Sequence, residues 1–252
     1  PPPPAGVAAP RPVPAYRREA GAWDEMLADD GSIRPHWRPF VQAMESAAPG
    51  LWENRRSAIQ RLLVDHGVTY NVYNDAQNAV RPWALDAVPF IVAAEEWQTV
   101  ASGIQQRTRL LNAILADLYG PQRLLREGWL PPALVHANPG FIRAACGVTP
   151  PGGAFLSSSG TDLVRGPDGA WKVLADRAQA PSGKGYALEN RTILANVLGD
   201  LFDACHVQRL AGFFDSERDC LRLLAPTRRG TPSVVMMTPG PMNETYFEHA
   251  YK

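Results

Sequence analysis

The chain is organised around residues 161–191, TDLVRGPDGAWKVLADRAQAPSGKGYALENR. Two short alternations of apolar and polar residues, DLVR and AWKVLAD, flank GPDG, and this arrangement predicts an antiparallel β-hairpin. Pro167 fixes φ at the first turn position, Asp168 tolerates the second, and Gly169 can adopt the left-handed conformation. The sequence therefore predicts a type I turn with a bulge at Gly169 and a three-residue loop.

The turn sets the pairing of the two strands. With a three-residue loop, Asp162 lies opposite Leu174, and Asp176 falls on the same face as Asp162, one pair further from the turn. Two carboxylates on one face, followed by Gln179, suit a hard cation that carries phosphates. A two-residue turn would instead put the carboxylates on opposite faces. Spacing alone favours the simpler alternative, a surface hairpin with solvated Asp side chains at its ends.

Residues 180–186, APSGKGY, follow the hairpin and contain two glycines, Ser182 and Lys184. Such a segment can offer backbone N–H groups and one cation to an anion. It is not a Walker P-loop, because G-K-[ST] at the required spacing is absent. The alternative interpretation is a flexible connection to the next helix.

Composition narrows the class of protein. The 252 residues contain 25 Lys plus Arg and 25 Asp plus Glu, so nothing indicates a nucleic-acid or anionic-membrane partner. No apolar run approaches the roughly 18–20 residues of a membrane span. The three cysteines form no C-x-x-C pair, which argues against a disulfide framework or structural zinc. We therefore expect a cytoplasmic protein.

Apolar periodicity and residue type predict the remaining elements. Helices are predicted at residues 54–66, 96–119, 216–224 and from 189 onward. β-branched and aromatic residues predict strands at 68–73, 87–93 and 154–159, the last of which would extend the hairpin into a small antiparallel sheet.

The C-terminal part has a different pattern. SVVMM, residues 233–237, predicts a buried strand of a parallel sheet, and NETYFEHAY, residues 243–251, predicts a helix after it. One strand and one helix do not complete a doubly wound layer. We therefore expect exposed apolar side chains within residues 233–251, and through them a protein partner or self-association.

Changes in composition divide the chain into four regions. Residues 1–21 are a Pro-rich tail that we expect to be disordered. Residues 22–149 form an N-terminal helical and mixed region, and residues 150–230 hold the hairpin and its helices. Residues 231–252 begin an α/β layer that the sequence leaves truncated.

Several long motifs carry a family resemblance. The hairpin stretch, with RPHW (34–37), YNVYND (70–75), LYGPQRLL (118–125) and TPGPMNETYFEHAY (238–251), resembles the circularly permuted ATP-grasp proteins related to glutathionylspermidine synthetase. The similarity runs from about Trp23 to the last residue. It implies an α+β (mixed α/β) fold that is a partial, glutathione-synthetase-like ATP-grasp. Its parts would be a helical N-terminal region, an antiparallel metal-site sheet and the first strand and helix of a Rossmann-like layer.

The resemblance also implies a reaction. In ATP-grasp enzymes ATP phosphorylates a carboxylate, an amine or thiol attacks the acyl-phosphate, and Mg²⁺ bridges the phosphates. It implies Asp162 and Asp176 as magnesium ligands, with Gln179 either a third ligand or a partner of one.

Further site residues follow from the same resemblance. Lys184 and Arg191 are implied as catalytic residues that contact phosphate or the substrate carboxylate. Gln179, Ser182 and Gly183 are implied as contacts to ATP.

Two functions follow as hypotheses. The chain is either part of an ATP-dependent carboxylate–amine, peptide-like ligase for small-molecule or peptide substrates, or a non-catalytic interaction module that keeps the fold without ATP turnover. The family's ATP-clamping lobe would follow residues 233–251. We therefore expect a truncated form, or one component of a split enzyme, and ATP affinity for this chain no better than about millimolar.

Overall fold

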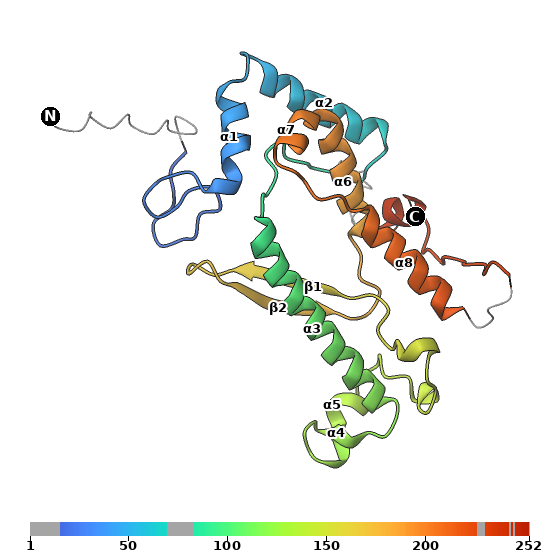
Figure 1. Ribbon diagram of the computed structural model, residues 1–252. Helices are drawn as coiled ribbons and strands as arrows, with labels where there is room; N and C mark the ends of the chain where they lie inside the picture. The colour runs from blue at the N-terminus through green and yellow to red at the C-terminus, as the bar shows by residue number, and fades with distance from the viewer. Residues whose placement is uncertain (1–15, 70–82, 226–229, 242, 244, 252) are drawn as a thin grey trace, which may run out of the picture.

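The computed structural model describes residues 16–69, 83–225, 230–241, 243 and 245–251 (Figure 1). The described part is about half helical, and the sheet found there is a two-stranded antiparallel hairpin. The elements in chain order are η1 (Pro35–Trp37), α1 (Arg38–Glu45), α2 (Leu51–Asp65), α3 (Ala94–Leu118), α4 (Arg123–Arg126), α5 (Pro132–His136), η2 (Arg143–Ala145), η3 (Pro151–Gly153), β1 (Gly160–Arg165), β2 (Trp171–Arg177), α6 (Lys184–Val197), α7 (Gly199–Ala204), α8 (Ala211–Leu224) and α9 (Tyr246–Tyr251).

The main core joins helices from both ends of the chain. Helices α1, α2, α6 and α7 lie together at one end of the molecule (Figure 1). Ile59 of α2 and Ile193 of α6 are fully buried, as is Leu198 between α6 and α7. Phe40 of α1 is 2% exposed and packs against Trp52 with ring centroids 5.7 Å apart. Burying each such side chain stabilises the fold by roughly 1.5–3 kcal/mol, so this cluster holds the two halves of the sequence together.

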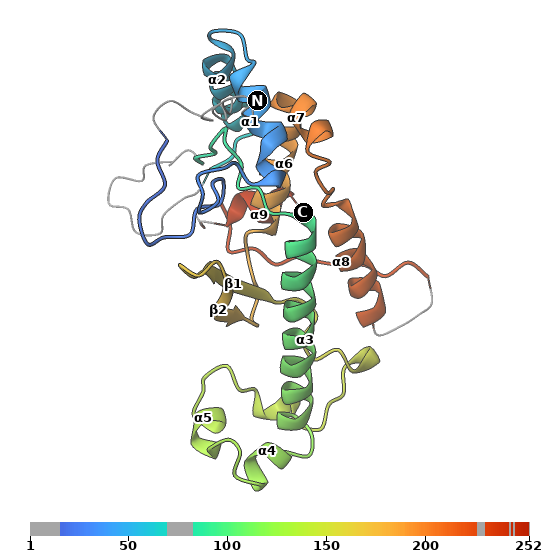
Figure 2. The ribbon, with the colours of Figure 1, turned by 60° about the vertical axis from the view of Figure 1, so that its left-hand side comes forward.

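Helix α3 extends away from this core and carries α4 and α5 at its far end (Figures 1 and 2). Its bounds confirm the helix predicted at residues 96–119 to within two residues. Within α3 only Val100 is buried, whereas Trp97 is 47% and Leu110 60% exposed. The other apolar side chains of the stripe that predicts the helix are half-buried, so the part of the chain that the structure describes covers this helix only in part.

The predicted turn is confirmed. The Gly169 N–H donates to the Gly166 carbonyl at 2.9 Å, and the Gly166 N–H donates to the Ala170 carbonyl at 2.9 Å. Gly169 has a φ of +80°, the left-handed conformation that the turn requires. Residues 167–169 thus form the three-residue loop.

Other elements differ from prediction. Residues 87–93, 154–159 and 233–237 form no strand, and most of the strand predicted at 68–73 lies outside the described residues. An apolar run needs a neighbouring strand to satisfy its backbone, and the described part of the chain offers these runs none. Helix α6 begins at Lys184, five residues before the predicted start at 189. Within the described ranges, the structure contains no helix both long and apolar enough to span a bilayer.

The exposure expected near the C-terminus is found for most of the side chains concerned. Val235 is 86% and Met237 92% exposed, and Val234 and Met236 are 60% and 49% exposed. Phe247 is the exception: it is half-buried on α9, and its ring centroid lies 5.3 Å from that of Tyr186. Residues 234–237 are therefore exposed as irregular backbone rather than as a strand.

Candidate functional site

A β-bulge in β2 changes the face on which Asp176 lies. Near the turn the pairing follows the predicted register as far as Leu163 opposite Val173. The register then shifts, so that Asp162 lies opposite Ala175 and Asp176 opposite Thr161. The unpaired residue is Leu174, which is 69% exposed. Because side chains alternate with a period of two, one extra residue moves every later β2 side chain to the other face.

The two carboxylates therefore lie on opposite faces of the hairpin, and the prediction that they share one is wrong. Asp176 lies on the face with Arg165, which α3 covers. Asp162 lies on the other face. The turn has the predicted three-residue loop. The bulge at Leu174, rather than a two-residue loop, therefore puts Asp162 and Asp176 on opposite faces.

Each carboxylate pairs with an arginine. Asp176 accepts from Arg107 Nε of α3 at 2.6 Å and from Thr161 Oγ1 at 3.2 Å, and its side chain is 15% exposed. Asp162 accepts from Arg177 Nε at 3.1 Å and Nη2 at 2.9 Å, and its side chain is 42% exposed. The hydrogen bond to Asp162 raises the pKa of the Arg177 guanidinium. A cation would have to displace a guanidinium at either position.

The glycine-rich segment is tied to two helices. Gln179 and Ser182 are exposed. The Gly183 N–H donates to the carboxylate of Glu248 on α9, and the Lys184 ammonium pairs with Glu217 on α8. The sequence predicts that the Gly183 N–H and the Lys184 ammonium bind an anion. In the structure, carboxylates of the protein bind both groups.

Arg191 differs from Lys184. Its guanidinium carbon lies 5.6 Å from the centre of the Phe202 ring, and burial lowers its pKa. Among the described residues, no carboxylate forms an ion pair with it. Of the two predicted catalytic cations, Arg191 is the one that an anionic substrate group could approach without breaking an ion pair.

Glu189 and Asn190, which directly precede Arg191, fix the position of α6. Glu189 is 2% exposed and its carboxylate lies 2.5 Å from His66 Nδ1 at the end of α2. Asn190 accepts from Trp83 Nε1 at 2.8 Å. Buried polar groups with partners of this kind fix the rotation of a helix, and here they set the direction in which Arg191 leaves α6.

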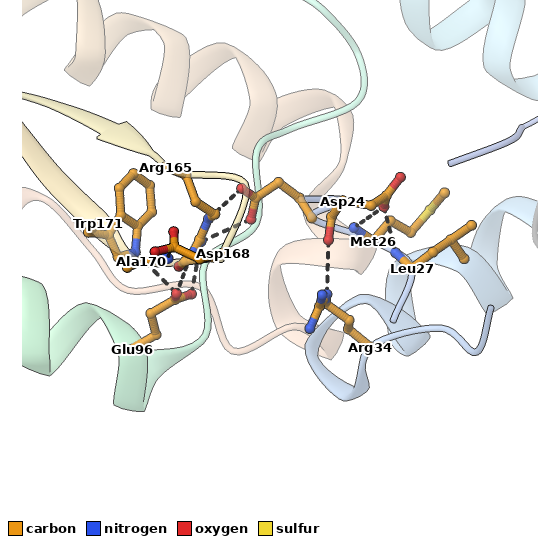
Figure 3. Close-up of polar contacts among 11 residues, drawn as sticks. Asp24, Met26, Leu27, Arg34, Glu96, Arg165, Asp168, Ala170 and Trp171 are labelled. Atoms are coloured by element: carbon orange, nitrogen blue, oxygen red, sulfur yellow. Dashed lines mark hydrogen bonds and ion pairs between the residues drawn. The ribbon is translucent and has the colours of Figure 1, made fainter. Parts of the chain in front are cut away.

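A buried polar cluster surrounds Arg165, a residue that no sequence motif marked as part of a site. Arg165 Nε and Nη2 donate to the two carboxylate oxygens of Glu25 at 2.5 and 2.9 Å. Glu96 of α3 accepts from both terminal nitrogens of Arg165, and from Trp171 Nε1 at 3.1 Å (Figure 3). The Arg165 side chain is only 7% exposed. We call Glu25, Glu96, Arg165 and Trp171 the Arg165 cluster.

Aromatic rings complete the surroundings of this cluster. The Arg165 guanidinium lies 4.1 Å from the Trp171 ring centre and 5.3 Å from that of Trp23. Trp23 also lies against the turn, where a Cβ on Gly169 would be 2.3 Å from a ring carbon. The hydrogen bond from Arg165 lowers the pKa of Glu96. The cluster thus joins the N-terminal segment and α3 to the tip of the hairpin.

The arrangement limits what this region can bind. Across the described part of the chain, no three His, Cys, Asp or Glu side chains form a group suited to a metal ion. Asp162 and Asp176 do not converge on one point, because they lie on opposite faces. A hairpin in this register offers a cation one carboxylate at a time.

Comparison with known proteins identifies the family. The chain belongs to the circularly permuted ATP-grasp type 2 family, whose pattern matches residues 89–251. This match confirms the family resemblance and includes the hairpin, the glycine-rich segment and Arg191.

Curated relatives extend the similarity to most of the chain. It is 38% identical over 237 residues to "Uncharacterized protein Rv2567" of Mycobacterium tuberculosis, covering 91% of this chain and 27% of that protein. It is 36% identical over 229 residues to "Uncharacterized protein sll0335" of Synechocystis sp., covering 91% of this chain and 48% of that protein. The chain therefore spans between about a quarter and a half of the length of these relatives.

Proposed function

We propose that this chain is part of an ATP-dependent carboxylate–amine ligase that acts through an acyl-phosphate. The observation that carries the proposal is the match to the ATP-grasp family over residues 89–251, because that family suggests ATP-dependent, ligase-like activity. The substrates proposed are small-molecule or peptide carboxylates and amines.

The proposal gives the hairpin acids and the α6 arginine separate roles. Asp162 is the proposed first ligand for Mg²⁺, since its carboxylate is the more exposed of the two. Asp176 and Gln179 remain proposed ligands, but Asp176 would reach the same ion only if β2 lost its bulge. Arg191 is proposed to bind a phosphate or a substrate carboxylate, since a guanidinium binds such groups through two parallel hydrogen bonds.

Lys184, Ser182 and Gly183 are proposed to contact ATP, and two of them must first release a carboxylate. The Lys184 ammonium would leave Glu217, and the Gly183 N–H would leave Glu248. This competition supports weak binding by the chain alone, with a dissociation constant no better than about millimolar.

Calorimetry with Mg-ATP tests the proposal. Arg177→Gln should tighten magnesium-dependent binding about threefold or more, because it removes the cation that competes for Asp162. Asp162→Asn should abolish the magnesium dependence. Lys172→Gln is the matched control, because Lys172 is an exposed cation of the same hairpin that pairs with Asp168 rather than Asp162. Equal effects of Arg177→Gln and Lys172→Gln would contradict a magnesium site at Asp162.

Exposed side chains favour a second function, that of an interaction module. Val235 and Met237 are among the most exposed large apolar residues, and such side chains are typical of interaction surfaces. Val235→Asp should reduce self-association in sedimentation experiments without changing the free energy of unfolding. Phe247→Ser should lower that free energy, because Phe247 packs on Tyr186. A clean monomer at high concentration, before any substitution, would contradict self-association through residues 233–251.

A further inference from the structure

We propose that Arg34, the first residue of the RPHW motif, binds the carboxylate of a small organic acid. The proposed function gives this motif no role. Of the five half-buried arginines in the described ranges, three form ion pairs with carboxylates of the protein, namely Arg18, Arg55 and Arg165. Arg34 and Arg191 are the other two. Because charged groups that leave water are generally paired in proteins, a half-buried guanidinium without a carboxylate indicates a place for an anion.

The direction of the Arg34 side chain is fixed by its surroundings. Its backbone N–H donates to the Met26 carbonyl at 2.8 Å. Its Nε donates to the Asp24 carbonyl at 2.9 Å (Figure 3), and its guanidinium carbon lies 3.8 Å from the centre of the Trp23 ring. A guanidinium held at its Nε and stacked on a ring loses little conformational entropy when it binds a ligand.

The terminal nitrogens of Arg34 are available to a ligand. Neither forms a hydrogen bond within the ranges that the structure describes. Neither is among the buried side-chain atoms that lack a partner, so both remain accessible from solvent. The two nitrogens form one edge of a planar fork, which can donate two parallel hydrogen bonds to a single carboxylate.

The acids beside Arg34 are already bound to other groups. The Asp24 carboxylate accepts three hydrogen bonds, from two backbone N–H groups and the Tyr16 hydroxyl. Arg34 and Arg165 share the Trp23 ring, but both carboxylates of the Arg165 cluster pair with Arg165. An ion pair with Arg34 therefore calls for an external acid.

The local charge favours a carboxylate over a phosphate. Arg34 and Arg165 carry two positive charges, and Glu25 and Glu96 carry two negative ones. Burial and the charges of Arg34 and Arg165 lower the pKa of His36 although Glu96 and Glu25 act to raise it, so the imidazole is neutral at pH 7. A phosphate monoester carries a charge of about −1.5 to −2 at this pH. These groups supply no second unpaired cation for it.

Benzoate, benzamide and phenyl phosphate test the proposal on the 252-residue chain. Benzoate and benzamide have nearly the same shape, and only benzoate is charged. Ligand-detected NMR should give a dissociation constant of about millimolar for benzoate, as expected for so few non-hydrogen atoms. Benzamide should bind about tenfold more weakly, because hydrogen bonds between charged groups are stronger than those of a neutral amide. Phenyl phosphate should also bind more weakly than benzoate.

Three variants locate the binding. Arg34→Gln should abolish the preference for benzoate over benzamide. Arg38→Gln is the matched control and should keep it, because Arg38 also donates its Nε to a backbone carbonyl, that of Ile33, but is exposed. Arg191→Gln should keep it too. Loss of the preference in Arg191→Gln alone would place benzoate at the proposed ligase site and overturn the assignment to Arg34.

His36 provides a readout on the wild-type chain, which serves even if Arg34→Gln does not fold. A carboxylate bound to Arg34 offsets one of the charges that lower the pKa of His36. In an NMR titration, benzoate should therefore raise this pKa toward its ordinary value of 6.5, and benzamide should leave it unchanged.

Several results would overturn the proposal. They are absence of saturable benzoate binding, equal binding of benzoate and benzamide, and a pKa of His36 that stays the same at saturating benzoate. Tighter binding of phenyl phosphate than of benzoate would exclude a site for carboxylates. None of these outcomes depends on the proposed ligase function, because Arg34 is not among the residues proposed to bind Mg²⁺ or ATP.

Discussion

Replacing Arg165 by methionine should destabilise the protein by about 3 kcal/mol. The substitution keeps an apolar stem against the rings of Trp171 and Trp23 but removes the charge-assisted hydrogen bonds to Glu25 and Glu96. Removing one partner of a buried ion pair costs about 3–5 kcal/mol. The side chains of Glu25 and Glu96 are 23% and 30% exposed, so they regain some hydration, and we expect the lower end of that range.

The assay is urea unfolding, with Arg177→Met as the matched control. Arg177 also pairs with a carboxylate of the protein, but its side chain is 64% exposed. Exposed ion pairs contribute little to stability, so the control should lose much less free energy of unfolding than Arg165→Met. Equal losses for the two variants would refute the conclusion that the Arg165 cluster joins the hairpin to α3 and the N-terminal segment.

The difference in free energy of unfolding between wild type and Arg165→Met should depend on pH. The hydrogen bond from Arg165 lowers the pKa of Glu96 below its ordinary value of 4.5. A carboxylate whose pKa is lower in the folded state contributes stability that is present above the unfolded pKa and is lost as pH falls through the folded pKa. The free-energy difference between wild type and Arg165→Met should therefore shrink below about pH 4.5. A constant difference from neutral pH into this range would contradict the ion pair.

Two further predictions concern the surroundings of the cluster. Gly169→Ala should lower the free energy of unfolding by about 1–3 kcal/mol more than Gly183→Ala. Both glycines have positive φ, but only at Gly169 would the added Cβ meet the Trp23 ring. Equal losses for the two variants in urea unfolding would contradict that contact. Burial and the hydrogen bond to Asp24 raise the pKa of Tyr16 to about 12. The contribution of Tyr16 to stability should thus be complete below about pH 10 and lost as pH rises through 12. Ultraviolet titration of wild type and Tyr16→Phe checks this pKa. If the phenol that the substitution removes ionises near pH 10, the raised pKa is contradicted.

Turn chemistry and long helices could be predicted from the sequence because their causes are local. Pro167 and Gly169 set backbone angles within one turn, and the structure has the predicted loop. Helix α3 follows from apolar periodicity over seven turns, and its bounds agree with the prediction. Family membership likewise depends on long motifs rather than on any contact.

Local residue patterns were thus sufficient to predict the hairpin, its turn, the long helix and the family. The face that each hairpin acid occupies could not be predicted, because the bulge at Leu174 has no signature in a short alternation of apolar and polar residues. The pairing of the cations could not be predicted either. Arg107, Lys184 and Arg165 find their carboxylates on elements distant in the chain, and such ion pairs depend on how helices and hairpin pack rather than on spacing in the sequence.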